Sequence, residues 1–407
     1  MKHADSALHI GLVGTAFASQ AQRGGLANYF RQLAHHLAEV DTENHYTLLL
    51  HPHSAALFQV DAPNFHTRVV PIPGRQAHYW EQLLLPLVLA ALPLDLVHFV
   101  GFPAVLAQRK PTVITLHDLS YKTLPHLRGD WLSRFHWRFF GDLGARRADH
   151  VITISEHSRR DIQRLLGIPA ERISVIYEAP APLFRPMAPE SARAVARDKY
   201  GVAGRYLLFV GTLQPTKNLA RLIDAYALAR QRAGITPALV IVGQKGWDFA
   251  DLFARVNRLG LDGQVIFTGY VPDDDLPALY SGAEAFVLPS LYEGFGLPVL
   301  EAMACGAPVI TSTVTSLPEI AGDAALLVDP LDTDALAQAL ARVCADAALR
   351  QHLRLTGLAR AAQFSWRRCA EETLAVYQRV ATAHRYGLLK PAGLKAGTGF
   401  SGPGWRR

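Results

Sequence analysis

The sequence predicts an α/β protein with two doubly wound parallel-sheet domains. The chain has 407 residues, more than one ordinary hydrophobic core accommodates. Short apolar, β-branched runs alternate with segments of helical periodicity, a pattern typical of parallel sheets with helices on both faces. The alternation stops in a proline-rich segment near residue 185 and begins again after residue 200, which indicates two such units.

The predicted strands follow the apolar runs in chain order. In the first half they are expected at 9–14, 45–51, 94–101, 112–118, 150–155 and 173–178. In the second half they are expected at 205–211, 238–243, 264–270, 283–290, 307–312 and 324–330. Helical periodicity fills the intervals and is clearest at 218–233 and 332–353.

The apolar segment 83–100 is the nearest candidate for a membrane span. It is shorter than the roughly 20 apolar residues that a spanning helix needs, and Pro86, Pro93 and Asp95 interrupt it. We therefore predict a buried helix followed by a strand.

These elements divide the chain into two Rossmann-like domains, at 1–185 and 186–365. A last helical stretch, 366–385, has no strand after it and is expected to pack across the domain junction. Residues 386–407 are rich in glycine, proline and basic residues and are predicted to be disordered.

The composition is typical of a folded enzyme, with 50% hydrophobic and 19% charged residues. The net charge of +6 suits anionic partners such as nucleotide phosphates, lipid surfaces or nucleic acid, without choosing among them. Three widely spaced cysteines, Cys305, Cys344 and Cys369, indicate neither a disulfide framework nor a metal cluster. The N-terminus does not resemble a signal peptide, so a cytoplasmic location is expected.

Two glutamates, Glu293 and Glu301, flank a predicted junction between a loop and a helix. The strand expected at 283–290 leads into the loop YEGFG, and Pro298 is typical of the first turn of a helix. Ligands of doubly wound domains bind where such loops meet helix N-termini, and the backbone N–H groups there favour a phosphate. Two carboxylates beside an anion site are suited to accept hydrogen bonds from hydroxyl groups on either side of it. The pattern therefore predicts a nucleotide sugar as the ligand.

The segment EGFGLPVLEAMACGAPVI, in which seven residues separate Glu293 from Glu301, resembles the signature of glycosyltransferase family 4, retaining enzymes of the GT-B fold. The resemblance covers residues 8–385 and is strongest at 205–330. It implies that Glu293 contacts hydroxyl groups of the donor hexose and that Glu301 holds the ribose. It also implies that the diphosphate is received by a run of backbone amides, those of Gly294, Phe295, Gly296 and Leu297.

A lysine and a departure from the family pattern accompany this loop. In GTLQPTKN, the resemblance assigns Lys217 to the donor diphosphate, just before a predicted helix. The family commonly has an arginine five residues earlier, where this chain has Thr212, and a second cation beside the lysine, where it has Thr216. Lys245 is the candidate for the missing charge, and a plain surface lysine is the alternative.

Three further groups of residues complete the predicted site. By resemblance, backbone groups of Tyr270 and Val271 pair with the nucleotide base, which leaves the base unidentified; an ordinary strand end is the alternative. Gly24 and Gly25 follow a predicted strand, where family members have a glycine pair that lets the backbone approach phosphate and acceptor; a simple turn is the alternative. His117 ends a predicted strand and, by resemblance, contacts the transferred sugar near the reaction centre.

Residues 128–160 combine arginine with bulky aromatic residues at helical spacing. The aromatic residues are Trp131, Phe135, Trp137, Phe139 and Phe140. Such a segment either lies in a bilayer interface or packs its aromatic face against the domain core. Both interpretations stay open, and a lipid-linked acceptor would favour the first.

The predicted function is retaining transfer of a hexose from a nucleotide diphosphate sugar to a saccharide or lipid-linked saccharide, in cell-surface polysaccharide biosynthesis. His117, Glu293 and Lys217 are the predicted catalytic residues. Lys217 and helix N–H groups would stabilise the leaving diphosphate without a metal ion or other cofactor, and the acidic run 273–275 is interpreted as helix N-terminal acids. The likeness to bacterial mannosyltransferases makes GDP-mannose the first donor. Nucleic acid is not an expected partner, and peripheral contact with the inner membrane surface is one of the two interpretations left open for residues 128–160.

The nearest alternative is a glucosyl- or N-acetylhexosaminyltransferase that uses a UDP-sugar. A sugar-nucleotide epimerase of the same architecture differs in its glutamate spacing and would act on the donor without an acceptor. A sugar-binding protein would ordinarily carry an export signal. An NAD-dependent dehydrogenase does not fit, because GFGLPVLEA lacks the third fingerprint glycine and an acid about 20 residues further on.

Overall fold

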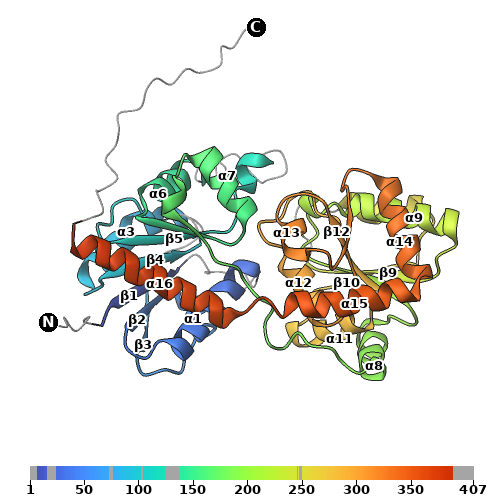
Figure 1. Ribbon diagram of the computed structural model, residues 1–407, viewed down its shortest axis with the longest axis horizontal. Helices are drawn as coiled ribbons and strands as arrows, with labels where there is room; N and C mark the ends of the chain where they lie inside the picture. The colour runs from blue at the N-terminus through green and yellow to red at the C-terminus, as the bar shows by residue number, and fades with distance from the viewer. Residues whose placement is uncertain are drawn as a thin grey trace, which may run out of the picture.

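The computed structural model describes residues 7–15, 24–72, 77–101, 104–124, 137–244, 246 and 250–387. Two parallel sheets, each covered by helices, form two domains that stand side by side (Figure 1). The predicted fold class is therefore confirmed. Among the described helices, none combines the length and the hydropathy that crossing a membrane requires. All but the first two residues of the predicted disordered tail, 386–407, lie outside the described residues.

The N-terminal sheet has seven parallel strands in the order β3-β2-β1-β4-β5-β6-β7. They are β1 (His9–Gly14), β2 (His45–Leu50), β3 (Phe65–Val69), β4 (Leu96–Val100), β5 (Thr112–Leu116), β6 (His150–Thr153) and β7 (Ile173–Val175). The central strands β4 and β5 are buried along their whole length, which is why the sequence shows them as apolar runs. The strand order reverses between β1 and β4, and this reversal opens a crevice at the carboxyl edge.

The C-terminal sheet has six parallel strands in the order β10-β9-β8-β11-β12-β13, with the same reversal between β8 and β11. They are β8 (Tyr206–Val210), β9 (Ala238–Val242), β10 (Val265–Gly269), β11 (Ala285–Leu288), β12 (Val309–Ser312) and β13 (Leu326–Val328). Loops that follow strands of both sheets line one shared cavity, so the two crevices face each other.

Helices connect the strands in both domains. In the N-terminal domain they are α1 (Gly25–Val40), α2 (Pro52–Ala55), α3 (Ala77–Ala91), α4 (Ser120–Thr123), α6 (Asp142–Arg147) and α7 (Glu156–Leu166). In the rest of the chain they are α8 (Pro189–Tyr200), α9 (Leu219–Ala233), α10 (Ala250–Arg258), α11 (Leu276–Gly282), α12 (Leu297–Ala304), α13 (Leu317–Ala321), α14 (Thr333–Ala345), α15 (Ala347–Ala361) and α16 (Trp366–Arg385). Pro189 stands in the first turn of α8, so the last proline of the interdomain segment begins a helix.

The last helix returns to the first domain, where α16 packs along α1 (Figure 1). Tyr377 of α16 has its hydroxyl 2.6 Å from Nδ1 of His98 on β4, and Nε2 of His98 lies 2.7 Å from Oγ1 of Thr115. Burial lowers the pKa of His98 to about 3, so its ring is neutral. A neutral imidazole has one donor and one acceptor nitrogen, which matches two hydroxyl partners. This network ties α16 to the N-terminal sheet.

Most strands are a few residues shorter than predicted, and two elements differ from the sequence prediction in number. The strand β3 was not predicted, because only Phe65 of its five residues is buried and the edge strand therefore shows no apolar run. The stretch 332–353 is not one helical element. Asp346 accepts a hydrogen bond from the Leu349 backbone N–H at 2.8 Å and caps a second helix there.

The apolar helix α3 differs in its environment. The sequence predicted a buried helix, and this is wrong for one face of α3, which is exposed to solvent. Leu85 and Leu89 are buried in the core, whereas Leu83 and Leu87 are 64% and 69% exposed. Trp80 lies on the same exposed side, at helical spacing from Leu83 and Leu87.

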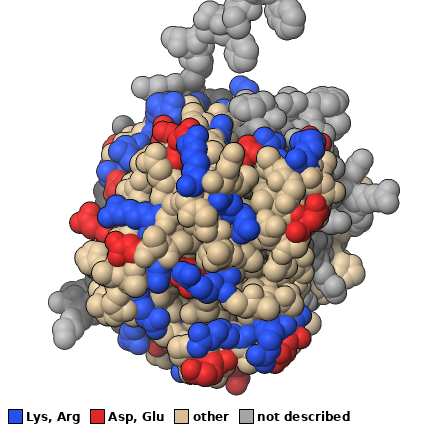
Figure 2. Space-filling model, turned by 90° about the vertical axis from the view of Figure 1, so that its right-hand side faces the viewer, with Lys and Arg blue, Asp and Glu red and all other residues tan. Residues whose placement is uncertain are grey.

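The net positive charge is not gathered on the outer face of the C-terminal domain. Figure 2 shows Lys and Arg side chains spread over this face among Asp and Glu. Several of these charges are paired across elements, for example Arg205 with Glu284 at 2.8 Å and Arg255 with Asp224 at 2.6 Å. Exposed pairs of this kind contribute little to stability.

Candidate active site

A cavity of about 600 Å³ lies between the two domains, where the carboxyl edges of both sheets meet. The predicted site residues that line it are Gly24, Gly25, His117, Thr212, Lys217, Tyr270, Val271, Glu293, Gly294, Phe295, Gly296, Leu297 and Glu301. Lys245 lies outside the described residues. The fold therefore brings residues from distant parts of the sequence, and from both domains, to one place.

The loop 293–297 joins β11 to α12 and is held by its neighbours. Ser316 Oγ lies 3.0 Å from the carbonyl oxygen of Glu293 and 2.8 Å from that of Phe295. Gly296 precedes the helix with φ of 105°, a backbone conformation that other residues rarely adopt. Leu297 and Pro298 in the first turn of α12 line the cavity, so the N-terminal end of the helix, which carries partial positive charge, faces it.

Lys217 and Glu293 form an ion pair inside the cavity. The distance between Nζ and Oε1 is 2.6 Å, and the two side chains are only 13% and 12% exposed. Oε1 of Glu293 also accepts a hydrogen bond from Ser290 Oγ at 2.6 Å. The sequence predicted both charged residues in the site but not their contact, which depends on β8 and β11 being neighbours in the sheet. An incoming diphosphate would compete with Glu293 for the ammonium group.

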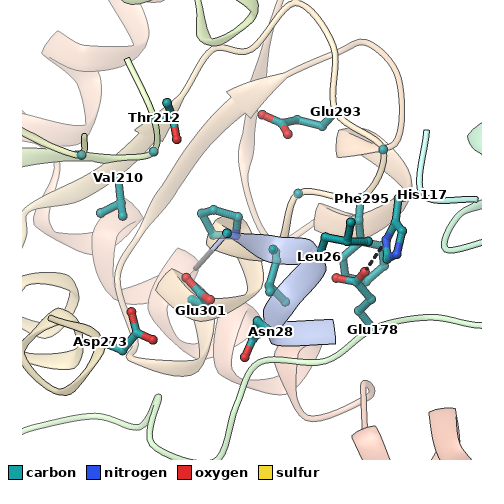
Figure 3. Close-up of a pocket in the computed structure, with 18 of the residues that line it drawn as sticks. Leu26, Asn28, His117, Glu178, Val210, Thr212, Asp273, Glu293, Phe295 and Glu301 are labelled. Atoms are coloured by element: carbon teal, nitrogen blue, oxygen red, sulfur yellow. Dashed lines mark hydrogen bonds and ion pairs between the residues drawn. The ribbon is translucent and has the colours of Figure 1, made fainter. Parts of the chain in front are cut away.

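Glu301 lies on the other side of the cavity from Glu293 (Figure 3). The Tyr280 hydroxyl donates a hydrogen bond to Oε2 of Glu301 at 3.0 Å. Burial raises the pKa of Glu301 to about 8 despite that bond, with further contributions from the negative charges of Asp273 and Glu178. A carboxyl group with a raised pKa in a cleft is typical of functional sites.

Asp273 is a lining residue that the sequence analysis left out of the site. The run Asp273–Asp275 forms a 3₁₀ turn directly before α11, as its interpretation as N-terminal acids predicted. Asp275 pairs with Lys199 at 2.7 Å, whereas Asp273 lines the cavity near Glu301 (Figure 3). The sequence pattern does not distinguish the three acids, because only their orientation in the turn separates them.

His117 follows β5 and contributes to the N-terminal wall of the cavity. Its Nδ1 lies 3.2 Å from Oε1 of Glu178, the contact dashed in Figure 3. The Tyr29 ring packs edge-on against the imidazole, with 4.7 Å between ring centroids. Nε2 of His117 has no hydrogen-bond partner among the residues that the structure describes. Glu178 therefore orients the ring, and Nε2 is a buried polar atom without a partner among these residues. Glu178 was not predicted as a site residue, although it ends a predicted strand.

Gly24 and Gly25 begin α1 and border open space. A Cβ atom added at either position would meet no atom within 4 Å, so packing among the described residues does not require glycine there. A ligand that approaches the backbone closely would require it. Asn28 and Arg31, about one turn further on, also line the cavity. Neither residue was predicted to belong to the site, since their spacing resembles that of any helix surface.

Thr212 lies at an exposed position after β8 and supplies no charge to the cavity. The lysine and arginine residues among the described lining are Lys217 and Arg31. Arg31 donates a hydrogen bond to Asn28 Oδ1 at 2.9 Å. Arg31 is therefore a second candidate, beside Lys245, for the positive charge that position 212 lacks.

Tyr270 and Val271 follow β10 and line the same cavity as Glu301. Tyr270 is 47% exposed, whereas Val271 is buried. This placement brings their backbone to the part of the cavity in which the resemblance puts the nucleotide.

The aromatic and basic stretch 128–160 is described from residue 137 onward, so Trp131 and Phe135 lie outside the described residues. A π-helical turn, Trp137–Gly141, leads into α6. Phe139 in this turn is 50% exposed. The core-packing interpretation therefore does not hold for Phe139.

Two family models match this chain. The model for glycosyltransferase family 4 matches residues 23–179, and the model for glycosyl transferases group 1 matches residues 196–358. O-antigen chain mannosyltransferase B from Escherichia coli is 39% identical over 267 residues, which are 65% of this chain and 70% of that protein. The chain belongs to glycosyltransferase family 4.

Solved structures agree with this family 4 glycosyltransferase in fold. Sucrose-phosphate synthase from Thermosynechococcus elongatus superposes with a TM-score of 0.74 at 24% identity, over 92% of this chain and all of the other. Anabaena HepE in complex with UDP-glucose superposes with a TM-score of 0.72 at 23% identity, over 91% of this chain and all of the other. At such identities the likeness establishes the GT-B fold and no more. In the described part of the chain, no three His, Cys, Asp or Glu side chains gather closely enough to hold a metal ion.

Proposed function

We propose that this glycosyltransferase transfers mannose from GDP-mannose to a saccharide acceptor with retention of configuration, in the assembly of a cell-surface polysaccharide. The observation that carries the proposal is the arrangement around the start of α12. The start of α12, the proposed anion site, lies between Glu293, paired with Lys217, and the mostly buried Glu301. Two carboxylates on either side of an anion site suit the hydroxyl groups of a hexose and of a ribose. The name of the E. coli relative, an O-antigen chain mannosyltransferase, supports mannose and polysaccharide assembly.

The reaction breaks the bond between the sugar C1 and the diphosphate oxygen and forms a bond between C1 and the acceptor oxygen. Negative charge grows on the leaving nucleoside diphosphate. In this proposal Lys217 and the N-terminal end of α12 stabilise it, and such fixed positive groups are usually the largest electrostatic contribution to catalysis. Retention follows if the acceptor attacks from the side of the leaving group, so that its proton passes to the departing phosphate oxygen.

Catalysis without a metal ion is part of this proposal. Support comes from the groups that would replace the cation, namely the ammonium group of Lys217 and the N-terminus of α12. Arg31, which approaches from the N-terminal domain, adds a second positive charge to the same cavity. The three groups together are suited to neutralise a diphosphate.

The donor is tested by calorimetric titration of the purified protein with GDP, UDP and ADP, followed by incubation with GDP-mannose and methyl α-mannoside. We expect GDP to bind most tightly, and NMR of the product to show the same anomeric configuration as the donor. Preference for UDP would favour the alternative of a UDP-sugar donor, of which the HepE complex with UDP-glucose is an example in this fold. Conversion of the nucleotide sugar without an acceptor would instead favour an epimerase.

Peripheral contact with the inner membrane surface is a second part of the proposal. Exposed apolar side chains on α3, namely Trp80, Leu83 and Leu87, lie in the same domain as the exposed Phe139. Both α3 and α6 flank the segment at Ala104, so these side chains belong to neighbouring elements. Exposed basic residues of this region are Arg138, Arg146 and Arg147. Apolar groups with basic neighbours are suited to an anionic bilayer.

Sedimentation with phosphatidylglycerol vesicles tests this contact. We expect the protein to sediment with these vesicles and the double variant Leu83→Asp/Leu87→Asp to stay in solution. Leu355→Asp is the matched control, because Leu355 is 57% exposed on α15 in the other domain. Equal sedimentation of the double variant and the control would contradict the contact.

A further inference from the structure

A carboxylate of the C-terminal domain caps a helix of the N-terminal domain. Glu319 of α13 accepts hydrogen bonds from the backbone N–H of Glu156 at 2.7 Å and of His157 at 3.1 Å, the first two residues of α7. It also accepts one from the Tyr177 hydroxyl at 2.9 Å. The first N–H groups of a helix have no partner within it and carry partial positive charge, so a carboxylate there satisfies both needs.

The same turn of α7 holds the donor loop. Ser155, the residue before α7, donates a hydrogen bond from Oγ to the carbonyl oxygen of Gly294 at 2.7 Å. Oγ of Ser158 lies 3.1 Å from the carbonyl oxygen of His117 and 3.3 Å from that of Gly294. Both serines are fully buried. The backbone of the loop that carries Glu293 and the backbone at His117 therefore meet at the hydroxyl groups of Ser155 and Ser158.

Gly294 and His117 are in close contact at this point. A Cβ atom on Gly294 would lie 2.6 Å from the carbonyl oxygen of His117, which is closer than real Cβ atoms come to other atoms. The backbones of the two domains therefore approach each other closely here. Any change in their relative position alters the distance between the loop that carries Glu293 and the wall that carries His117.

A third contact joins the donor loop to α7. Tyr292 donates a hydrogen bond from its hydroxyl to Oδ2 of Asp161 at 3.0 Å, and both residues are buried. Burial tends to raise the pKa of Asp161, but hydrogen bonds from His157, Arg164 and Tyr292 hold it low, at about 2. The carboxylate is therefore charged at neutral pH, and the contact is a charge-assisted hydrogen bond.

We infer that the first turns of α7 form an interdomain joint that positions the donor loop against His117, and that Glu319, Ser155 and Tyr292 act as positioning residues for the transfer reaction. None of the three lines the cavity. Their effect passes through Gly294 to the neighbouring Glu293, and through Ser158 to His117. The inference rests on the GT-B fold and the glycosyltransferase activity, and not on the identity of the donor.

Glu319→Ala is the direct test. The variant loses the acceptor of two helix N–H groups, so the ratio of the joined to the separated arrangement of the domains should fall by about tenfold or more. We expect turnover of GDP-mannose with methyl α-mannoside to fall by up to that factor, and the affinity for GDP, measured by calorimetry, to stay within twofold. Small-angle scattering should give a larger radius of gyration than for the wild type, because the domains are less firmly held.

Asp346→Ala is the matched control, because it removes a carboxylate from the N-terminus of α15 within a single domain. It should change neither turnover nor the radius of gyration. Glu319→Gln, which keeps one acceptor oxygen, should recover part of the turnover. Tyr292→Phe removes one hydroxyl group and leaves the ring, so it tests the joint should Glu319→Ala not fold. It should also lower turnover, by a smaller factor than Glu319→Ala does.

Wild-type turnover and an unchanged radius in both Glu319→Ala and Tyr292→Phe would overturn the joint. So would a loss of GDP affinity equal to the loss of turnover, because Glu319 would then act on the donor site itself. If the wild type does not turn over GDP-mannose, the proposed donor fails, whereas the comparison of radii still decides the joint.

Discussion

Glu301 should couple nucleotide binding to the release of a proton. Its pKa is raised to about 8 by burial, so the carboxyl group of the free enzyme is mostly protonated at pH 7. If the two hydroxyl groups of a ribose donate to this group, they favour the ionised form, which offers acceptors on both oxygens. Binding should therefore be weaker at neutral pH than at alkaline pH.

The size of the effect follows from the pKa. At pH 7 a group with a pKa of about 8 is ionised in about one molecule in ten, and ionising the rest costs about 1.4 kcal/mol. The dissociation constant for GDP should therefore fall by about tenfold between pH 7 and pH 9. At pH 7, close to one proton should be released for each GDP bound, because most of the free enzyme carries that proton.

The same group should make the free enzyme less stable as pH rises. Its folded pKa lies above the unfolded value of 4.5, so the folded state holds the proton more tightly than the unfolded state. Between about pH 4.5 and pH 8 the free energy of unfolding should fall by up to about 1.4 kcal/mol per pH unit from this group. Glu301→Gln, which cannot ionise, should remove this contribution.

Calorimetry of GDP binding at several pH values, in buffers of different ionisation enthalpy, measures both affinity and proton release. Thermal unfolding at pH 6 and pH 8.5 measures the effect on stability. Glu301→Gln should bind GDP more weakly than the wild type at pH 9 and should release no proton. An identical pH dependence of GDP binding in the wild type and in Glu301→Gln would refute the assignment of Glu301 to the ribose.

Three further substitutions test the rest of the site. Lys217→Ala should reduce turnover at saturating donor by about 10²–10³, and Lys217→Arg should restore little of it. The activity of the wild type should persist in EDTA, and its abolition by EDTA with recovery on Mn²⁺ would contradict the metal-independent proposal. Glu293→Ala should lower turnover without weakening GDP binding, since it frees Lys217 for the diphosphate; a parallel loss of both in calorimetry and rate assays would count against its contact with the sugar. Gly294→Ala should force the loop away from His117 and lower turnover, as measured in rate assays. Unchanged kinetics would show that the contact is dispensable.

Local patterns in the sequence were sufficient to predict the fold class and to place the loop between Glu293 and Glu301 at a ligand-binding crevice. The central strands of a doubly wound sheet are buried on both faces, so each one stands out as an apolar run. The donor loop is equally local. Glu293, the glycines after it and Glu301 belong to one strand–loop–helix unit, whose geometry follows from a few consecutive residues. The edge strand β3 escaped prediction because it has no buried face to leave a pattern.

The contacts that tune the site were decided by tertiary structure alone. Lys217 and Glu293 are 76 residues apart in the chain, His117 and Glu178 are 61 apart, and Glu156 and Glu319 are 163 apart. Each contact depends on which strands are neighbours in a sheet or on how the two domains meet, and periodicity within a segment carries no information about either. The raised pKa of Glu301 has the same origin, because it results from burial among side chains that separate elements bring together.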